Sequence, residues 1–365
     1  MKTPRKICAF LLAAALMTAM MSSCGKTGSV KIDEKRFPDT RFREYVSDNF
    51  DLNGDGELSE EELSAVSKIK ISDIEIRDED LEEPISSLKG IEYFTNLQTL
   101  TLKESCALDE LDLSKNTELV ELVCINCGVS KLDVSGCTKL GKLECCVNSL
   151  TELDLQNLAE LTYLDCNNNN LTELDVSKCA GLTFLNCSAN KLTGLDVSKC
   201  TGLEYLYCSN NGLTALDVSG CTELEDLSCN NNSLTELNVG MCTELTSLLC
   251  RENGLTALDV SGCTSLRELD CRSNSLTVLD ISECADLREL DCMENGLTAL
   301  DLSKCTNLGH LTCTLNKLTE LDVSGCTELE YLDCGYNKLT EIDISDCKSL
   351  DSRSLNCGDG VNVIQ

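Results

Sequence analysis

Apolar and polar residues alternate along most of the chain in a pattern that repeats every 21 residues. In the repeat that begins at position 182, the apolar positions and cysteines are Leu182, Leu185, Cys187, Leu192, Leu195, Val197, Cys200 and Leu203. Each half of the repeat alternates inward leucines with outward polar residues over a short segment, the pattern of a strand with one buried face. A fixed period in this range indicates stacked units, because one thin coil cannot bury its own leucines.

The two halves of the repeat are alike, and this likeness predicts the architecture. Each half carries a Leu-x-Cys or Leu-x-Val segment, and no spacer long enough for a helix separates the halves. We therefore expect a β-rich solenoid with two short parallel strands per coil, in two facing sheets that curve less than a helix-backed horseshoe. At about 4.8 Å per coil, twelve coils over residues 97–349 give a rod roughly 55–60 Å long.

Each half-repeat also fits the consensus L-x-x-L-x-L-x-x-N/C from about Leu97 to Leu350. This pattern resembles that of the leucine-rich repeats, and in particular the 21-residue bacterial type called IRREKO. The resemblance implies a leucine-cored solenoid and, by analogy, a binding surface.

The chain has 27 cysteines, and most of them stand in two ladders with the same 21-residue step. One ladder runs from Cys124 to Cys334, and the other runs from Cys137 to Cys347 with Leu158 in one position. Neighbouring side chains in a ladder point in parallel, so they suit neither disulfides nor the convergent thiolates that zinc requires. We expect buried free thiols, with some disulfides or a metal site as the alternatives.

The first coils depart from this regularity. The irregular segment "KESCAL" contains Cys106, and Cys127 stands where later coils have asparagine, so this pair is the best candidate for an exception. Asparagine follows the first ladder by three residues from Asn148 to Asn337. We expect its inward amide to hydrogen-bond backbone groups of its own and adjacent coils.

An acidic column repeats at the same interval, from Asp112 to Asp343, with Asn238 in one position. The recurrent Asp-x-Ser sequence favours an Asx turn, and a weak cation-binding stripe is the alternative. Asn238 keeps the hydrogen-bonding capacity of this position and loses its charge, which favours the turn.

A different motif precedes the coils. The segment "DLNGDGELSEEE" fits the EF-hand calcium loop, and helix-like segments flank it within residues 35–70. We predict that one Ca²⁺ binds there through Asp51, Asn53, Asp55, Glu57 and Glu62, with a water-mediated contact from Ser59. An acidic turn without calcium is the alternative. Dockerin modules use similar loops in two copies, and only one copy is present here.

Few aromatic residues occur in the coils, and four of them share neighbouring outward positions. Tyr163, Phe184 and Tyr205 occupy one column in three successive coils, and Tyr207 lies beside them. These rings either stabilise the sheet by cross-strand stacking or form an exposed patch that anchors a partner.

The first residues resemble a bacterial export signal. A basic start and an apolar run over residues 1–23 precede "MSSC", which resembles the lipobox of bacterial lipoproteins. That resemblance implies a lipidated Cys24, a tether over residues 24–34 and an extracytoplasmic location, anchored to the cell membrane by lipid alone. An ordinary cleaved signal is the alternative. We expect residues 71–96 and 350–365 to cap the two ends of the solenoid.

Composition narrows the function further. The formal net charge of −32 disfavours nucleic acid and anionic membrane as partners. His310 is the sole histidine, and the repeats offer no unique pocket, so we predict that the protein is not an enzyme. We expect a cell-surface binding module that presents a flat face to a protein or glycan. A structural envelope spacer or a calcium-stabilised scaffold is the alternative.

Overall fold

The computed structural model describes residues 28–72, 84–104, 106–351 and 353–365. The predicted signal segment and the predicted lipidation site at Cys24 lie outside the described residues. Within the described part of the chain, no helix has the length and apolar character needed to span a bilayer.

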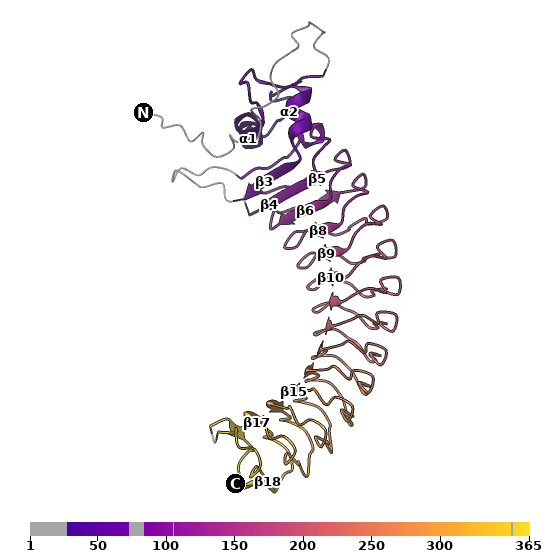
Figure 1. The fold of residues 1–365 in the computed structure, drawn as a ribbon, viewed down its shortest axis with the longest axis vertical. Coiled ribbons are helices and arrows are strands. Elements are labelled where there is room, and N and C mark those ends of the chain that lie inside the picture. Colours follow the sequence, from indigo (N-terminus) through magenta and orange to yellow (C-terminus); the bar gives the residue numbers. More distant parts are fainter. Residues whose placement is uncertain (1–27, 73–83, 105, 352) are drawn as a thin grey trace, which may run out of the picture.

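The chain forms an arc-shaped solenoid with one long sheet along its concave side (Figure 1). The sheet has 14 strands, and their order across the sheet follows their order along the chain. These strands are β3 (Lys68–Ser72), β4 (Thr99–Lys103), β6 (Glu121–Ile125), β8 (Lys142–Glu144), β9 (Tyr163–Asp165), β10 (Phe184–Asn186), β11 (Tyr205–Tyr207), β12 (Asp226–Ser228), β13 (Ser247–Leu249), β14 (Glu268–Asp270), β15 (Glu289–Asp291), β16 (His310–Thr312), β17 (Tyr331–Asp333) and β19 (Leu355–Asn356). Neighbours pair in parallel, and from β8 to β17 the partners lie one repeat apart, as Phe184 and Tyr205 do.

The core of the solenoid consists of the predicted inward positions. The middle residue of each short strand is a buried leucine, such as Leu185 and Leu206, which are both 0 % exposed. Each cysteine of the first ladder comes two residues after such a leucine, and the second ladder lies in the other half of each coil. The cysteines of both ladders are 0–4 % exposed. The described cysteines are free thiols, and all except Cys357 are buried. The prediction of buried free thiols is therefore confirmed for the two ladders.

The second half of each coil forms a less regular sheet than we expected. Three-residue strands pair only near the ends, as β5 (Glu110–Asp112) with β7 (Lys131–Asp133) and β18 (Glu341–Asp343) with β20 (Asn362–Ile364). In the middle coils the pairing narrows to single-residue bridges, for example between Asp196 and Asp217. The solenoid forms the arc of Figure 1 rather than a straight rod, with the three-residue strands on its concave side.

Both polar columns have the predicted hydrogen bonds. The side-chain amide of Asn190 donates to the carbonyl oxygens of Cys166 and Cys187 at 3.0 and 3.1 Å, which ties two coils together. In the acidic column, Asp175 Oδ1 accepts from the amide of Ser177 at 2.9 Å, the geometry of an Asx turn. Asn238 makes the same contact with the amide of Gly240 at 3.1 Å, so the turn interpretation is confirmed.

A small helical module packs against the first end of the solenoid (Figure 1). It contains β1 (Val30–Lys31), α1 (Thr40–Phe50), β2 (Glu57–Leu58) and α2 (Glu60–Ala65), and the 3₁₀ turn η1 (Ile91–Tyr93) follows β3. Phe42 of α1 is fully buried in the same core as the leucines, and the rings of Phe50 and Phe94 lie 5.3 Å apart. The module therefore covers the apolar end of the first coil. Strand β3, which follows the module in the chain, is the first strand of the long sheet.

The last residues continue the solenoid by one more turn. Strand β19 pairs in parallel with β17 in the long sheet, and β20 pairs in parallel with β18 in the other half. The segment 350–365 thus covers the end of the solenoid with an additional coil of shorter strands.

Candidate functional site

The long concave sheet presents two columns of outward side chains, because residues 1 and 3 of each short strand point away from the leucine core. Their chemistry changes along the arc. Four lysines stand on the first strands, Lys68, Lys70, Lys103 and Lys142, and two carboxylates, Glu121 and Glu144, stand among them. Aromatic rings follow on β9–β11, and carboxylates follow on β12–β17: Asp226, Glu268, Asp270, Glu289, Asp291 and Asp333.

The four aromatic residues predicted as a patch come together on β9, β10 and β11. The rings of Tyr163 and Phe184 stack with centroids 4.2 Å apart and planes 3° from parallel. Tyr207 meets Phe184 edge-on at 5.7 Å, and Tyr205 lies 6.3 Å from the same ring. All four side chains are half-buried, so the cluster both stacks across strands and leaves ring surface open to solvent.

Polar groups fix both edges of this aromatic cluster. On one side, Lys142 Nζ lies 5.0 Å from the centre of the Tyr163 ring and 2.7 Å from the Glu144 carboxylate. The hydrogen bond that Lys142 donates to Glu144 raises the pKa of Lys142 despite partial burial, so the ammonium over the Tyr163 ring stays charged. On the other side, the Tyr205 and Tyr207 hydroxyls donate to carboxylates of the next coil at 2.9 and 3.0 Å. The ring positions are therefore held by contacts that extend over five successive coils, from β8 to β12.

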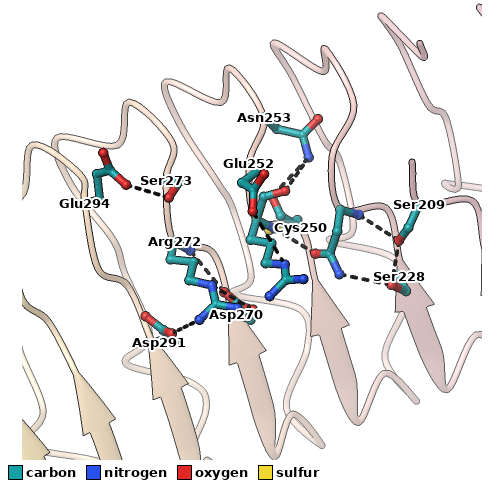
Figure 2. A network of polar contacts seen from close by, with 12 residues as sticks. Ser209, Ser228, Cys250, Glu252, Asn253, Asp270, Arg272, Ser273, Asp291 and Glu294 are labelled. Carbon is teal, nitrogen blue, oxygen red and sulfur yellow. Dashed lines mark hydrogen bonds and ion pairs between the residues drawn. The ribbon is translucent and has the colours of Figure 1, made fainter. Parts of the chain in front are cut away.

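The acidic end of the face contains a second polar cluster (Figure 2). Arg272 lies between two carboxylates, with Nη1 3.1 Å from Asp291 Oδ2 and Nε 3.5 Å from Asp270 Oδ2. Burial raises the pKa of Asp270 to about 7, and the neighbouring Asp291 adds to the shift. A hollow of about 370 Å³ lies here, and its lining includes Glu289 and His310. The sequence pattern did not point to these two aspartates as a candidate site.

The predicted calcium loop has its own local geometry. Asp51 follows α1 directly, and its carboxylate accepts from the amides of Gly54 and Gly56 at 2.7 and 3.0 Å. Asn53 Oδ1 accepts from the amide of Asp55 at 2.8 Å, and Asp55 Oδ1 accepts from the amide of Glu57 at 2.9 Å. Gly56 has φ +79°, the left-handed conformation that the sharp turn at this position requires.

Glu62 closes the same loop from α2. It is only 8 % exposed, and its two carboxylate oxygens accept from the amides of Leu52 and Ser59, both at 2.8 Å. Burial opposes the charge of Glu62, but these hydrogen bonds outweigh it and hold its pKa below the ordinary value. Strand β2 within the loop pairs with β1, Val30 opposite Leu58, in an antiparallel ribbon.

The side-chain atoms of this loop that could bind a metal are all oxygens, which suits calcium. In the described structure these oxygens accept hydrogen bonds from the loop's own amides. Across the described residues, no three His, Cys, Asp or Glu side chains converge as a metal site would require. The calcium site therefore remains a prediction, supported by the motif and by the backbone of the loop.

Comparisons with known proteins place this geometry in a family. Family models described as "Leucine Rich repeats (2 copies)" and "Leucine Rich repeat" match residues 201–239 and 167–183. The functional domain of InlJ from Listeria monocytogenes, described as including a cysteine ladder, is 33% identical to this chain. The match covers 92% of this chain and 77% of that one, with a TM-score of 0.71. The chain belongs to the leucine-rich-repeat family.

Other leucine-rich-repeat structures share the fold at lower identity. Internalin InlF from L. monocytogenes is 23% identical over 92% of this chain and 98% of its own, with a TM-score of 0.72. The plant peptide hormone receptor RGFR1, solved in complex with RGF2, is 23% identical over 75% of this chain and 53% of its own, with a TM-score of 0.58. No curated protein matches the sequence.

Proposed function

We propose that this leucine-rich-repeat chain is a non-enzymatic binding module of the bacterial cell surface, and that its concave sheet receives a protein partner. The observation that carries the proposal is the aromatic cluster of Tyr163, Phe184, Tyr205 and Tyr207 on the outward face. These rings contribute nothing to the leucine core behind the strands, and part of each stays accessible. Clustered tyrosine and phenylalanine side chains are enriched where proteins bind other proteins.

The charges on the concave face indicate how a partner would be oriented. Lysines outnumber carboxylates before the aromatic cluster, and carboxylates predominate after it along the arc. A complementary partner presents acidic side chains toward Lys68 and Lys70 and basic side chains toward Asp291 and Asp333. Such complementarity fixes the orientation of binding and accelerates association more than it adds affinity.

We further propose that Cys24 carries the lipid anchor and that the Asp51–Glu62 loop binds one Ca²⁺. The anchor rests on the "MSSC" motif and would tether the module outside the cytoplasm. Calcium would order the module that covers the first coil. Metabolic labelling with palmitate tests the anchor: we expect incorporation in the natural chain and none in Cys24→Ala, and unchanged incorporation in that variant would contradict the assignment.

A crosslinking experiment tests the binding proposal. In one variant a photoreactive amino acid replaces Phe184. In the control variant it replaces Lys199, which is exposed in a turn outside the long sheet. Each variant is displayed on the cells that produce it, and these cells are mixed with candidate partner cells; we expect many protein crosslinks from position 184 and few from position 199. Equal crosslinking from both positions would contradict a concave binding site.

A matched pair of substitutions separates binding from stability. Phe184→Ser removes the central ring, and serine fits the column because Ser247 occupies the same position three coils later. Val278→Ser removes an apolar side chain that is 70 % exposed outside the long sheet. We expect only Phe184→Ser to lose the partner. If Phe184→Ser loses binding to a glycan rather than to a protein, the concave face is the binding site but the proposed class of partner is wrong. If the natural chain captures no partner at all, the alternative of a structural envelope spacer is favoured.

A further inference from the structure

The asparagine column ends in cysteines at the N-terminal coils. Asn148 donates from its side-chain amide to the carbonyl oxygens of Cys124 and Cys145 at 2.7 and 3.1 Å, as the later asparagines do in their coils. One repeat earlier this position is Cys127, and two repeats earlier it is Cys106. A thiol cannot replace two amide donors, and Cys127 Sγ donates only to the carbonyl oxygen of Ile125, at 3.3 Å. The hydrogen-bonding role of the column is therefore lost where the cysteines begin.

The regular stacking of the coils changes around Cys106, Cys124 and Cys127. Leu102 pairs with Cys124, 22 residues later, whereas Cys106 precedes Cys127 by 21, so the first coil has one extra residue between strand and turn. This insertion shifts the register of the first coil against the second between strand and turn. The thiols of Cys106 and Cys124 both lie within hydrogen-bond reach of Cys127 Sγ.

Cys106 and Cys127 belong to neighbouring turns that the backbone already joins. Cys106 forms a parallel bridge with Ile85 of the N-terminal cap, and the next amide, of Ala107, donates to Ile85 at 2.9 Å. The amide of Leu108 donates to the carbonyl oxygen of Cys127 at 2.7 Å. Adjacent strands of this kind lie about 5 Å apart, within the Cα separation that a disulfide spans.

We propose that Cys106 and Cys127 are a redox-active pair that forms a disulfide between the first two coils upon oxidation by a small peroxide. Cys124 is the less suitable partner, because it lies in the regular strand β6, whereas Cys106 lies in the irregular turn. Cys127 is fully buried and Cys106 is 6 % exposed, so the reaction favours hydrogen peroxide over bulky oxidants. The three thiols do not form a metal site among the described residues.

The chemistry balances with peroxide as the only co-reactant. The Cys127 sulfur attacks one peroxide oxygen, the O–O bond breaks, and the other oxygen leaves as water with the thiol proton; Cys127 becomes a sulfenic acid. The Cys106 sulfur then attacks the Cys127 sulfur, the S–O bond breaks, and a second water leaves with the Cys106 proton. The two thiols lose two electrons, and hydrogen peroxide gains them.

Electrostatics make Cys127 the attacking sulfur. Hydrogen bonds from the Cys106 and Cys124 side chains stabilise its thiolate and hold its pKa well below the usual range, although burial opposes this. In the regular ladder burial has no such compensation, and it raises the pKa of the Cys187 thiol to about 12. Since the thiolate is the nucleophile, we expect peroxide to react with Cys127 before it reacts with the ladder thiols.

Peptide mapping of the reduced full chain after brief exposure to hydrogen peroxide tests the pair. Cleavage after Lys103, Lys115 and Lys131 places Cys106 in one peptide and both Cys124 and Cys127 in the next. After alkylation in denaturant without reduction, we expect these two peptides to be linked and the ladder cysteines to be alkylated. Alkylation of both peptides without a link, or links spread along the ladders, would overturn the proposal.

Three variants identify the sulfurs and control for folding. Cys127→Asn restores the residue found in every later coil, and Cys124→Leu matches Leu102, its strand neighbour; both should fold. We expect the link to vanish in Cys127→Asn and to persist in Cys124→Leu. In Cys106→Ser, Cys127 should stop at the sulfenic acid, which dimedone traps. A link that persists in Cys127→Asn, or no dimedone adduct in Cys106→Ser, would contradict the assigned roles.

Discussion

Asn169 donates from its side-chain amide to the carbonyl oxygen of Cys145 in the preceding coil, at 3.0 Å. The same nitrogen donates to Cys166 at 3.1 Å, and Oδ1 accepts from the amide of Leu150 at 3.0 Å. The side chain is 8 % exposed, so water cannot replace these partners freely. This one residue therefore satisfies backbone groups from two coils, and its repetition explains why a chain with such short strands stacks in register.

Replacing Asn169 by alanine should destabilise the solenoid by about 2–3 kcal/mol, because buried backbone groups of two coils lose their partners. Asn170→Ala is the matched control: the neighbouring side chain is more exposed and varies among lysine, glycine and serine in the next coils. Urea unfolding followed by far-ultraviolet circular dichroism measures both. Equal midpoints for the two variants would show that the asparagine column is dispensable.

The ladder thiols should resist modification in the folded protein. Burial raises the pKa of Cys229 and Cys187 to about 12, and neither sulfur is exposed. We expect a maleimide reagent at pH 7 to label them only after denaturation and without prior reduction. Cys357, which is partly exposed, should react in the folded chain and provides an internal control. Ladder thiols that require reduction before labelling would instead indicate disulfides.

Calcium should stabilise the N-terminal module specifically. We expect one Ca²⁺ to bind with a Kd of about 10⁻⁴–10⁻³ M, the range of extracellular modules. Asp51→Asn and Glu62→Gln keep the size of each side chain and should abolish binding in calorimetry, whereas Asp48→Asn in α1 should not. Hydrogen exchange should show added protection around residues 37–69, because a solenoid couples mainly to its nearest neighbours. Equal protection along all coils would indicate that the acidic column binds the cation.

The coil architecture was predictable because one column of residues determines it. Once leucine recurs at the interval that separates Leu185 from Leu206, parallel pairing in register follows, and with it the stacking of Tyr163 on Phe184. The free thiols followed from the leucine that replaces cysteine at position 158. Simple periodicity was thus sufficient for the core and for the aromatic cluster.

Contacts outside the period were not predictable in the same way. The ribbon between Val30 and Leu58 joins two segments whose sequences show no common pattern. The bridge from Arg272 to Asp291 crosses coils at an offset of 19 residues, which depends on how a long side chain leans along the sheet. The second half-repeat pairs through single-residue bridges in the middle coils, although its apolar pattern resembles that of the first half.

The acidic cluster leads to a prediction about pH. The folded-state pKa of Asp270 is about 7, raised by burial and then by Asp291, whereas an unfolded aspartate titrates near 3.9. Folding therefore favours the protonated carboxyl, whose contribution to stability is complete below about pH 4 and is lost as the pH rises to about 7. The charged groups that act on Asp270 from its own and neighbouring coils are Asp291, Arg251, Glu268, Glu252 and Arg272.

Asp270→Asn should remove this loss of stability at neutral and higher pH, because the amide carries no charge. Asparagine fits the position, because Asn186 occupies it four coils earlier and accepts from the amide of Ser188 at 3.1 Å. We expect the Tm of the variant to exceed that of the natural chain at pH 8 and to match it near pH 4. Asp259→Asn is the control of opposite sign: hydrogen bonds from the Ser261 side chain and amide lower the pKa of Asp259, so its charged form stabilises the fold. That variant should gain nothing at pH 8, and a similar gain in both variants would show that the effect is a general relief of negative charge.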